Sequence, residues 1–158
     1  MNNCKLTQVA LILSLLVIAL MTYKFILSGE TIEASDGRQA LLLEPAERDL
    51  VLGEMRLFLL SVQQITQAVT DNDLPAVARA AKQVGAAAQQ TVPGSLIKKL
   101  PFEFKKLGFD THGKFDQLAL DGEQFGDTQV VLEQLSALMH NCVACHELYR
   151  IDPALEAE

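Results

Sequence analysis

Apolar residues recur at alternating spacings of four and three positions in the stretch that follows Pro45. Side chains at these spacings share one face of an α-helix, which can bury that face against its neighbours. The positions that form this face are Val51, Met55, Phe58, Val62, Ile65 and Val69. Pro45 suits the first turn of a helix, and the polar run 70–73 ends the pattern. The sequence therefore predicts a helix between these two points.

Three further stretches show helical spacing and are separated by turn residues. Asp73 is suited to cap a second helix, and the run 92–95, which contains proline and glycine, ends that region. Pro101 opens a third helix, and the fourth extends from about residue 127 to 151. The inward positions predicted for these helices are Val77, Ala81, Val84 and Ala88, then Phe104, Leu107, Phe115 and Leu118, then Val131, Leu135, Leu138, Cys142, Cys145 and Tyr149.

Four helices with short connections predict an all-α domain over residues 44–158, arranged as an antiparallel up-down-up-down four-helix bundle. Composition favours the same class, because aromatic residues make up only 6% of the chain and Trp is absent. Residues 30–43 mix glycine, acidic and apolar residues without a sustained period. We expect this segment to be a linker.

The N-terminal segment, residues 1–29, contains a long apolar run. From Leu6 to Leu27 the only charge is Lys24, and a helix of this length spans about 33 Å, enough to cross a bilayer. Lys5 precedes the run and acidic residues follow it, which places the N-terminus inside and the rest of the chain in the periplasm. We expect a single-pass anchor in the cytoplasmic membrane. A cleaved signal peptide is the alternative.

The exported part carries 11 basic and 20 acidic side chains, a net charge of −9. A surface of this sign repels phosphate backbones, so nucleic acid is excluded as an expected partner. Four lysines at positions 98, 99, 105 and 106 form the one basic patch of the domain. Such runs are most often solvated, although this one could dock an acidic redox partner.

The residues with a chemical signature are Cys142, Cys145 and His146, in the run Cys-Val-Ala-Cys-His. This spacing is that of a c-type haem attachment site, in which the two thiols bond to haem c and the imidazole binds its iron. Two cysteines at this spacing can also form a redox disulfide or half of a zinc site. A thioredoxin-like redox disulfide normally lies in a βαβ unit, and a zinc site requires two further ligands. The exported domain shows neither a βαβ pattern nor another cysteine.

The chain resembles the cytochrome c′ family and its non-covalent b-type relative over roughly residues 45 to 152. The resemblance rests on the haem motif near the end of the fourth helix and on the third-helix string from Leu100 to Gly108, followed by His112. It implies a single haem inside a helical bundle. It also implies that Arg150 lies near the haem propionates, a residue that could equally be a solvated arginine. His112 is expected at the surface.

The residue opposite His146 on the iron decides the function within this family. Low-spin members use a first-helix methionine there, which indicates electron transfer, whereas high-spin members leave the position open to small gases. Met55 lies on the inward face of the first helix at a height compatible with His146 of the antiparallel fourth helix. We expect Met55 as the second iron ligand, although a methionine on such a face is often only a core residue.

These observations predict a membrane-tethered cytochrome that transfers single electrons between redox proteins of the membrane and periplasm, and no enzymatic activity. The alternative is a five-coordinate protein that binds nitric oxide or carbon monoxide. Membership of a larger membrane complex is a third candidate. Leu52 and Leu59, beside the inward face of the first helix, leave a homodimer open.

Overall fold

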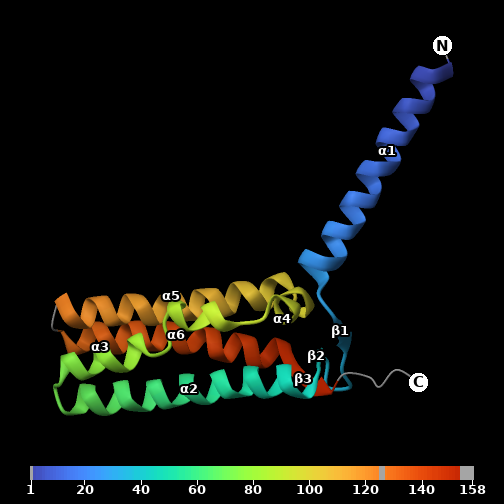
Figure 1. Cartoon of the computed structure of the whole chain (residues 1–158). Helices are drawn as coiled ribbons and strands as arrows, with labels where there is room; N and C mark the ends of the chain where they lie inside the picture. The colour runs from blue at the N-terminus through green and yellow to red at the C-terminus, as the bar shows by residue number, and fades with distance from the viewer. Residues whose placement is uncertain (1, 125–126, 154–158) are drawn as a thin grey trace.

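The computed structural model describes residues 2–124 and 127–153. The described chain is mostly helical, as predicted, and Figure 1 shows helices lying side by side below a projecting N-terminal helix. The α-helices are α1 (Asn2–Thr22), α2 (Pro45–Thr70), α3 (Leu74–Lys82), α4 (Gly94–Lys99), α5 (Phe102–Gln124) and α6 (Thr128–Leu148). A π-helical turn, η1 (Tyr23–Ser28), and a 3-10 turn, η2 (Ala86–Thr91), connect them. The strands are β1 (Thr31–Glu33), β2 (Gln39–Leu43) and β3 (Tyr149–Pro153).

Helix starts follow the capping residues seen in the sequence. Pro45 opens α2, and the Glu47 carboxylate accepts a hydrogen bond of 3.1 Å from the backbone N–H of Glu44. The Asp73 carboxylate accepts one of 2.9 Å from the N–H of Ala76 at the start of α3. These bonds satisfy N–H groups that have no partner within the helix, which fixes where each helix begins.

The main core lies between α2, α3, α5 and α6, and the predicted inward residues supply most of it. Its members include Phe58, Ile65, Val77, Val84, Phe115, Leu118, Leu135 and Leu138, all buried. Among the inward residues predicted for the second helix, Ala88 is the exception. It is exposed and lies in η2, not in α3. The side chains of Met55, Val62 and Cys142 pack against this core from its edge.

The expected linker 30–43 is instead part of a three-stranded sheet, which corrects the all-α expectation. β2 pairs with β1 in antiparallel and with β3 in parallel, so that Leu41 faces Thr31 on one side and Ile151 on the other. Ala40, Leu41 and Leu43 are fully or almost fully buried. An apolar run of this length is too short to show a period, and its strand partner β3 is more than a hundred positions away.

The fourth helix is shorter than predicted at its C-terminal end. It stops at Leu148, and the residues expected to continue it to Ile151 form β3. The backbone N–H of Tyr149 still bonds to the carbonyl of Cys145, but Tyr149 itself is extended. Pairing with β2 therefore overrides helix continuation just after the segment that holds Cys142, Cys145 and His146.

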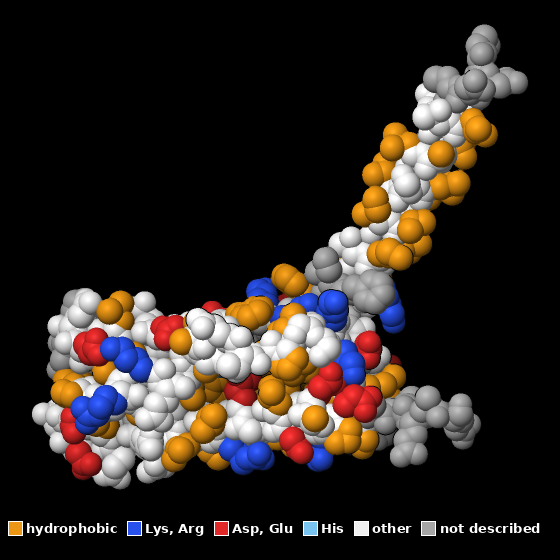
Figure 2. Space-filling view, in the orientation of Figure 1, with side chains coloured by type: hydrophobic (Ala, Val, Ile, Leu, Met, Phe, Trp, Pro, Cys, Tyr) orange, Lys and Arg blue, Asp and Glu red, His pale blue; other side chains and the backbone are white. Residues whose placement is uncertain are grey.

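Helix α1 projects away from the other helices, as Figure 1 shows. The segment Lys5–Thr22 has a mean hydropathy of 2.0 and none of it is buried. Figure 2 shows hydrophobic side chains along both sides of the projecting helix. The helix is long and apolar enough to be a membrane span, and a signal sequence would look the same.

Candidate functional site

A cavity of about 550 Å³ lies between α2, α5 and α6. Four of the predicted site residues line it together: Met55 from α2, and Cys142, Cys145 and His146 from α6. Leu52, Phe58, Leu59, Val62, Phe104 and Leu107 give it largely apolar walls. Its volume lies within the range of about 300–1,000 Å³ that small-molecule and cofactor sites occupy.

Helix α6 presents the three motif residues from its last two turns. Cys142 and His146 lie one turn apart and so share a face, with Cys145 beside them. Burial raises the pKa of the Cys145 thiol to about 11, and it also raises the pKa of Cys142. Both thiols are therefore neutral near pH 7, which disfavours the low-pKa thiolate that reactive redox cysteines present.

Met55 reaches the cavity from the opposite wall. It is half-buried and packs against both the main core and a second cluster formed by Leu41, Leu43, Val51, Leu96 and Leu100. Met139 also lines the cavity, but it belongs to α6 and is 41% exposed. Met139 and His146 are seven positions apart on one helix, about 10 Å along its axis, so Met55 is the methionine that faces the motif from another helix.

The prediction that His112 is a surface residue is wrong, because its side chain is only 2% exposed. Its Nδ1 lies 2.7 Å from the carbonyl oxygen of Val84 and its Nε2 lies 3.2 Å from Oε1 of Glu54. Burial alone would lower its pKa, but the Glu54 carboxylate and the Val84 carbonyl outweigh burial and raise it. The centroid of the His112 ring lies 4.9 Å from that of Phe58. His112 and Glu54 both line the cavity, so this hydrogen-bonded pair forms a polar part of its wall.

A second cavity of about 230 Å³ adjoins the first, and Met55, Cys145 and His146 line both. Three arginines line this second cavity: Arg38 from the segment before β2, Arg48 from α2, and Arg150 from β3. Only Arg150 was a predicted site residue. Arg38 and Arg48 carried no signal in the sequence, because their proximity depends on the β2–β3 pairing and on the start of α2.

Acidic partners hold two of these arginines in place. Arg150 lies 2.9 Å from Asp152 and 3.3 Å from Asp36, and Arg38 lies 2.7 Å from Asp36. The hydrogen bonds from Arg38 lower the pKa of Asp36 to about 2. Arg38 also donates to the carbonyl oxygens of His146 at 3.4 Å and Tyr149 at 3.5 Å, so it caps the C-terminal end of α6.

Asn141 is a polar residue of the cavity wall that was not among the predicted site residues. It is buried, and its amide nitrogen donates to Asp110 at 2.7 Å and to Thr111 at 3.2 Å. Asn141 precedes Cys142, so these bonds connect α6 to α5 directly beside the motif. Among the described residues, no group of three or more His, Cys, Asp or Glu side chains is arranged to hold a metal ion.

Comparison with known proteins identifies no relative. No family model matches the chain, no curated protein matches it, and no solved structure matches it. The resemblance to the cytochrome c′ family therefore depends on the residues quoted from the sequence, and the function is argued from the site itself.

Proposed function

We propose that this chain is a membrane-tethered c-type cytochrome that carries single electrons. The observation that supports it most directly is the cavity of about 550 Å³ lined jointly by Met55, Cys142, Cys145 and His146. These residues supply two thiols, one imidazole and one thioether around an apolar space. That donor set fits a covalently attached haem with histidine and methionine on its iron.

Each residue has a defined task in this proposal. Cys142 and Cys145 would hold the haem on α6 through thioether bonds, and His146 and Met55 would supply the ligands of its iron. Haem supplies a one-electron redox centre, whose potential histidine–methionine ligation raises. The guanidinium groups of Arg38 and Arg150 would neutralise its propionate carboxylates at the adjoining cavity.

The surrounding helices keep both ligands in place. Met55 packs against two buried clusters, and α6 is connected to α5 by Asn141 and to the sheet by Arg38. A site held in this way changes little when the iron changes charge, which favours rapid electron transfer. The long helices α2, α5 and α6, with the shorter α3, would form the up-down-up-down bundle inferred from the sequence around this cofactor.

We also propose that α1 remains in the cytoplasmic membrane, with its N-terminus inside and the haem domain in the periplasm. The apolar segment Lys5–Thr22 and the position of Lys5 before it support this orientation. The partners would then be redox proteins of the membrane or periplasm, and no catalytic group is needed.

The test is absorption spectroscopy of oxidised and dithionite-reduced protein matured in a host that attaches c-type haem. We expect a low-spin spectrum with a methionine-to-iron charge-transfer band that Met55→Ala abolishes. Met139→Ala is the matched control, because it removes another methionine from the same cavity, and it should leave the band unchanged.

Carbon monoxide distinguishes the alternative function. The reduced wild-type protein should bind it weakly, and Met55→Ala should bind it readily because one iron position is then open. A high-spin wild-type spectrum with ready carbon monoxide uptake would make gas binding the better account. Absence of covalent haem, seen as a polypeptide mass without the haem increment, would reject both functions.

A further inference from the structure

Two exposed phenylalanines and an exposed lysine lie on one face at the start of α5, and the exposed Lys98 precedes them at the end of α4. We call this the α4–α5 surface, formed by Lys98, Phe102, Lys106 and Phe109. Phe102 is 44% exposed and Phe109 is 51% exposed, unusual values for phenylalanine in a domain with a well-filled core. Phe102, Lys106 and Phe109 are spaced by four and three positions, so they project from one face of α5.

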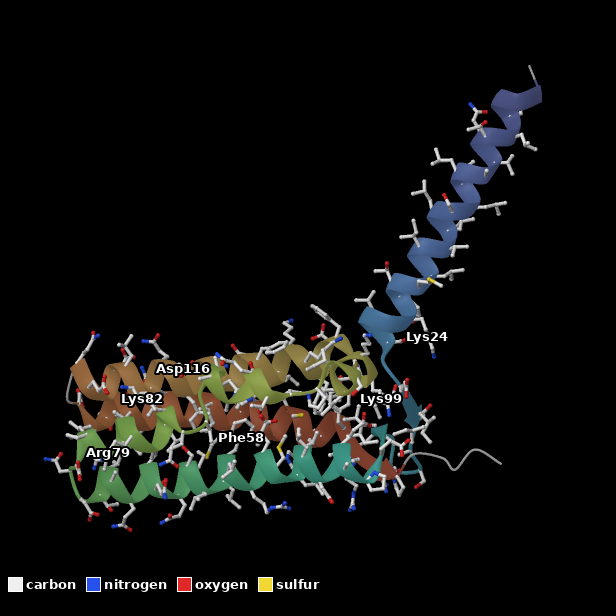
Figure 3. The ribbon with its side chains drawn as sticks, viewed as in Figure 1. Lys24, Phe58, Arg79, Lys82, Lys99 and Asp116 are labelled. Carbon is white, nitrogen blue, oxygen red and sulfur yellow. The ribbon has the colours of Figure 1, made fainter. Side chains whose placement is uncertain are left out.

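The chain that leaves the anchor is fixed beside this surface. The backbone N–H of Glu30 donates to the carbonyl oxygen of Lys99 at 2.7 Å. Gly29 is buried with a φ of 63°, and a Cβ there would lie 2.5 Å from the backbone nitrogen of Pro101. The turn η1 packs against both α4 and α5. The α4–α5 connection is therefore held at the end of the anchor, as Figure 3 shows for Lys24 and Lys99.

The charge of this region is opposite to that of the domain. The exported part has a net charge of −9, yet four of its 11 basic side chains lie at positions 98, 99, 105 and 106, and Lys24 ends the anchor. Lys99 is paired with Glu47 at 2.8 Å, whereas Lys106 lies 3.6 Å from Glu103 with its side chain 66% exposed. Figure 2 shows Lys and Arg side chains gathered at the base of the projecting helix.

We propose that the α4–α5 surface lies against the bilayer that holds the anchor and binds anionic phospholipid headgroups. Phe102 and Phe109 enter the interfacial layer, while Lys98 and Lys106 contact the headgroup phosphates. This combination of apolar rings and cations is the one that favours an interface over free water. The contact holds the haem domain in one orientation relative to the membrane. The inference depends on the proposed membrane insertion of α1.

The chain contains no Trp, so a single introduced Trp reports from one place only. The full-length protein is reconstituted in nanodiscs of phosphatidylcholine and phosphatidylglycerol, with ordinary or brominated acyl chains. We expect brominated lipid to reduce the fluorescence of Phe109→Trp at least about twofold, since bromine quenches only nearby indoles in the interface. Comparing one variant in two lipids cancels any quenching by the haem.

Leu120→Trp is the matched control. Leu120 is 45% exposed on the same helix, and 11 positions beyond Phe109 it returns to nearly the same face about 16 Å further along the axis. Its fluorescence should be almost equal in the two lipids. Leu16→Trp, within α1, should be strongly quenched and so reports whether the anchor is inserted.

The outcomes separate the two proposals. If Leu16→Trp is quenched but Phe109→Trp is quenched no more than Leu120→Trp, the surface does not lie on the membrane, whereas the anchor remains. If Leu16→Trp is not quenched, the anchor is not inserted and the inference fails with it. Quenching of Leu16→Trp and Phe109→Trp, without quenching of Leu120→Trp, supports both.

The lysines are tested in the Phe109→Trp background with the double change Lys98→Glu and Lys106→Glu. We expect quenching to fall at least about twofold in discs that contain phosphatidylglycerol. The control changes the same charge on α3, with Arg79→Glu and Lys82→Glu, at the other end of the domain from Lys99 (Figure 3). Unchanged quenching in the first double variant would reject headgroup binding by these lysines and make an acidic redox protein their better partner.

Discussion

At the scale of single residues, His112 shows how a polar side chain becomes part of a core. It lies three positions before Phe115 and seven before Ala119, both buried, so its spacing does place it on the inward face of α5. Its ring nitrogens face Val84 and Glu54, which come from other parts of the chain. Those partners make burial tolerable, because they satisfy both nitrogens of the protonated ring.

The raised pKa of His112 predicts how stability depends on pH. A proton held more tightly in the folded state stabilises it fully below the unfolded pKa of about 6.5, and this contribution is lost as pH rises through the folded pKa. Glu54→Gln should therefore lower the free energy of unfolding by about 1–2 kcal/mol in mildly acidic solution and by less in alkaline solution. Urea unfolding in detergent at several pH values measures the difference.

Glu103→Gln is the control for this experiment, because the Glu103 side chain is 61% exposed and its ion pair with Lys106, at 3.6 Å, lies at the surface. It should change stability little at any pH, as expected of exposed ion pairs. An effect of Glu54→Gln that is the same at all pH values would show that His112 is neutral in the folded protein.

Two glycines offer a second test at this scale. A Cβ on Gly85 would lie 1.8 Å from Oδ1 of Asp116, whose other oxygen accepts a hydrogen bond of 2.9 Å from Ala86. Gly85→Ala should therefore displace Asp116 and lower the free energy of unfolding by about 1–2 kcal/mol.

Nothing lies within 4 Å of a Cβ on Gly113, in the middle of α5. Gly113→Ala should therefore raise the free energy of unfolding by about 0.5–1 kcal/mol. Thermal unfolding measures both, and equal effects would contradict the packing around Gly85.

At the scale of secondary structure elements, β2 is the segment whose role differs most from expectation. Its residues pair with β3, the strand that follows the Cys142–His146 segment. They bury Leu41 and Leu43 against a cluster that includes Val51, Leu96 and Leu100. Met55 packs against this second cluster as well as against the main core. The chain between α1 and α2 therefore contributes to the surroundings of Met55 and is more than a connection between two helices.

Leu41→Ala distinguishes a strand from a linker. Leu41 is fully buried in β2, so its truncation should cost about 2–5 kcal/mol of unfolding free energy. Ile32→Ala, in the same segment 30–43, is the control. Ile32 in β1 is 44% exposed, so its truncation should cost much less unfolding free energy. Denaturant unfolding compares the two variants. Similar small effects would mean that residues 30–43 do not pack on the domain.

At the scale of the whole molecule, the chain divides into a projecting apolar helix, α1, and a domain whose two ends meet. Strand β2, which follows α1 and β1 in the chain, lies next to β3 near the C-terminus, as Figure 1 shows. The segment Lys5–Thr22 is 0% buried, so its apolar side chains are not covered by the domain. The bilayer of the proposed membrane insertion would cover them, whereas an uncovered apolar surface would favour aggregation.

The mass of the mature protein tests this division. We expect a polypeptide that retains residues 1–29 and stays in the membrane fraction after an alkaline carbonate wash. Intact-mass spectrometry measures the first property, and immunoblotting of the washed fractions measures the second. A mass that lacks this segment, with protein released to the soluble periplasmic fraction, would establish a cleaved signal peptide.

The sequence by itself determined the features that depend on local order. Helical spacing, Pro45 and Asp73 located α2 and α3, because caps and periodic faces act over a few residues. The spacing of Cys142, Cys145 and His146 was likewise local. Tertiary structure alone decided the β2–β3 pairing, the burial of His112 against Glu54, and the meeting of Arg38 with Arg150. Each of these joins positions far apart in the chain, and one sequence carries no record of such pairings.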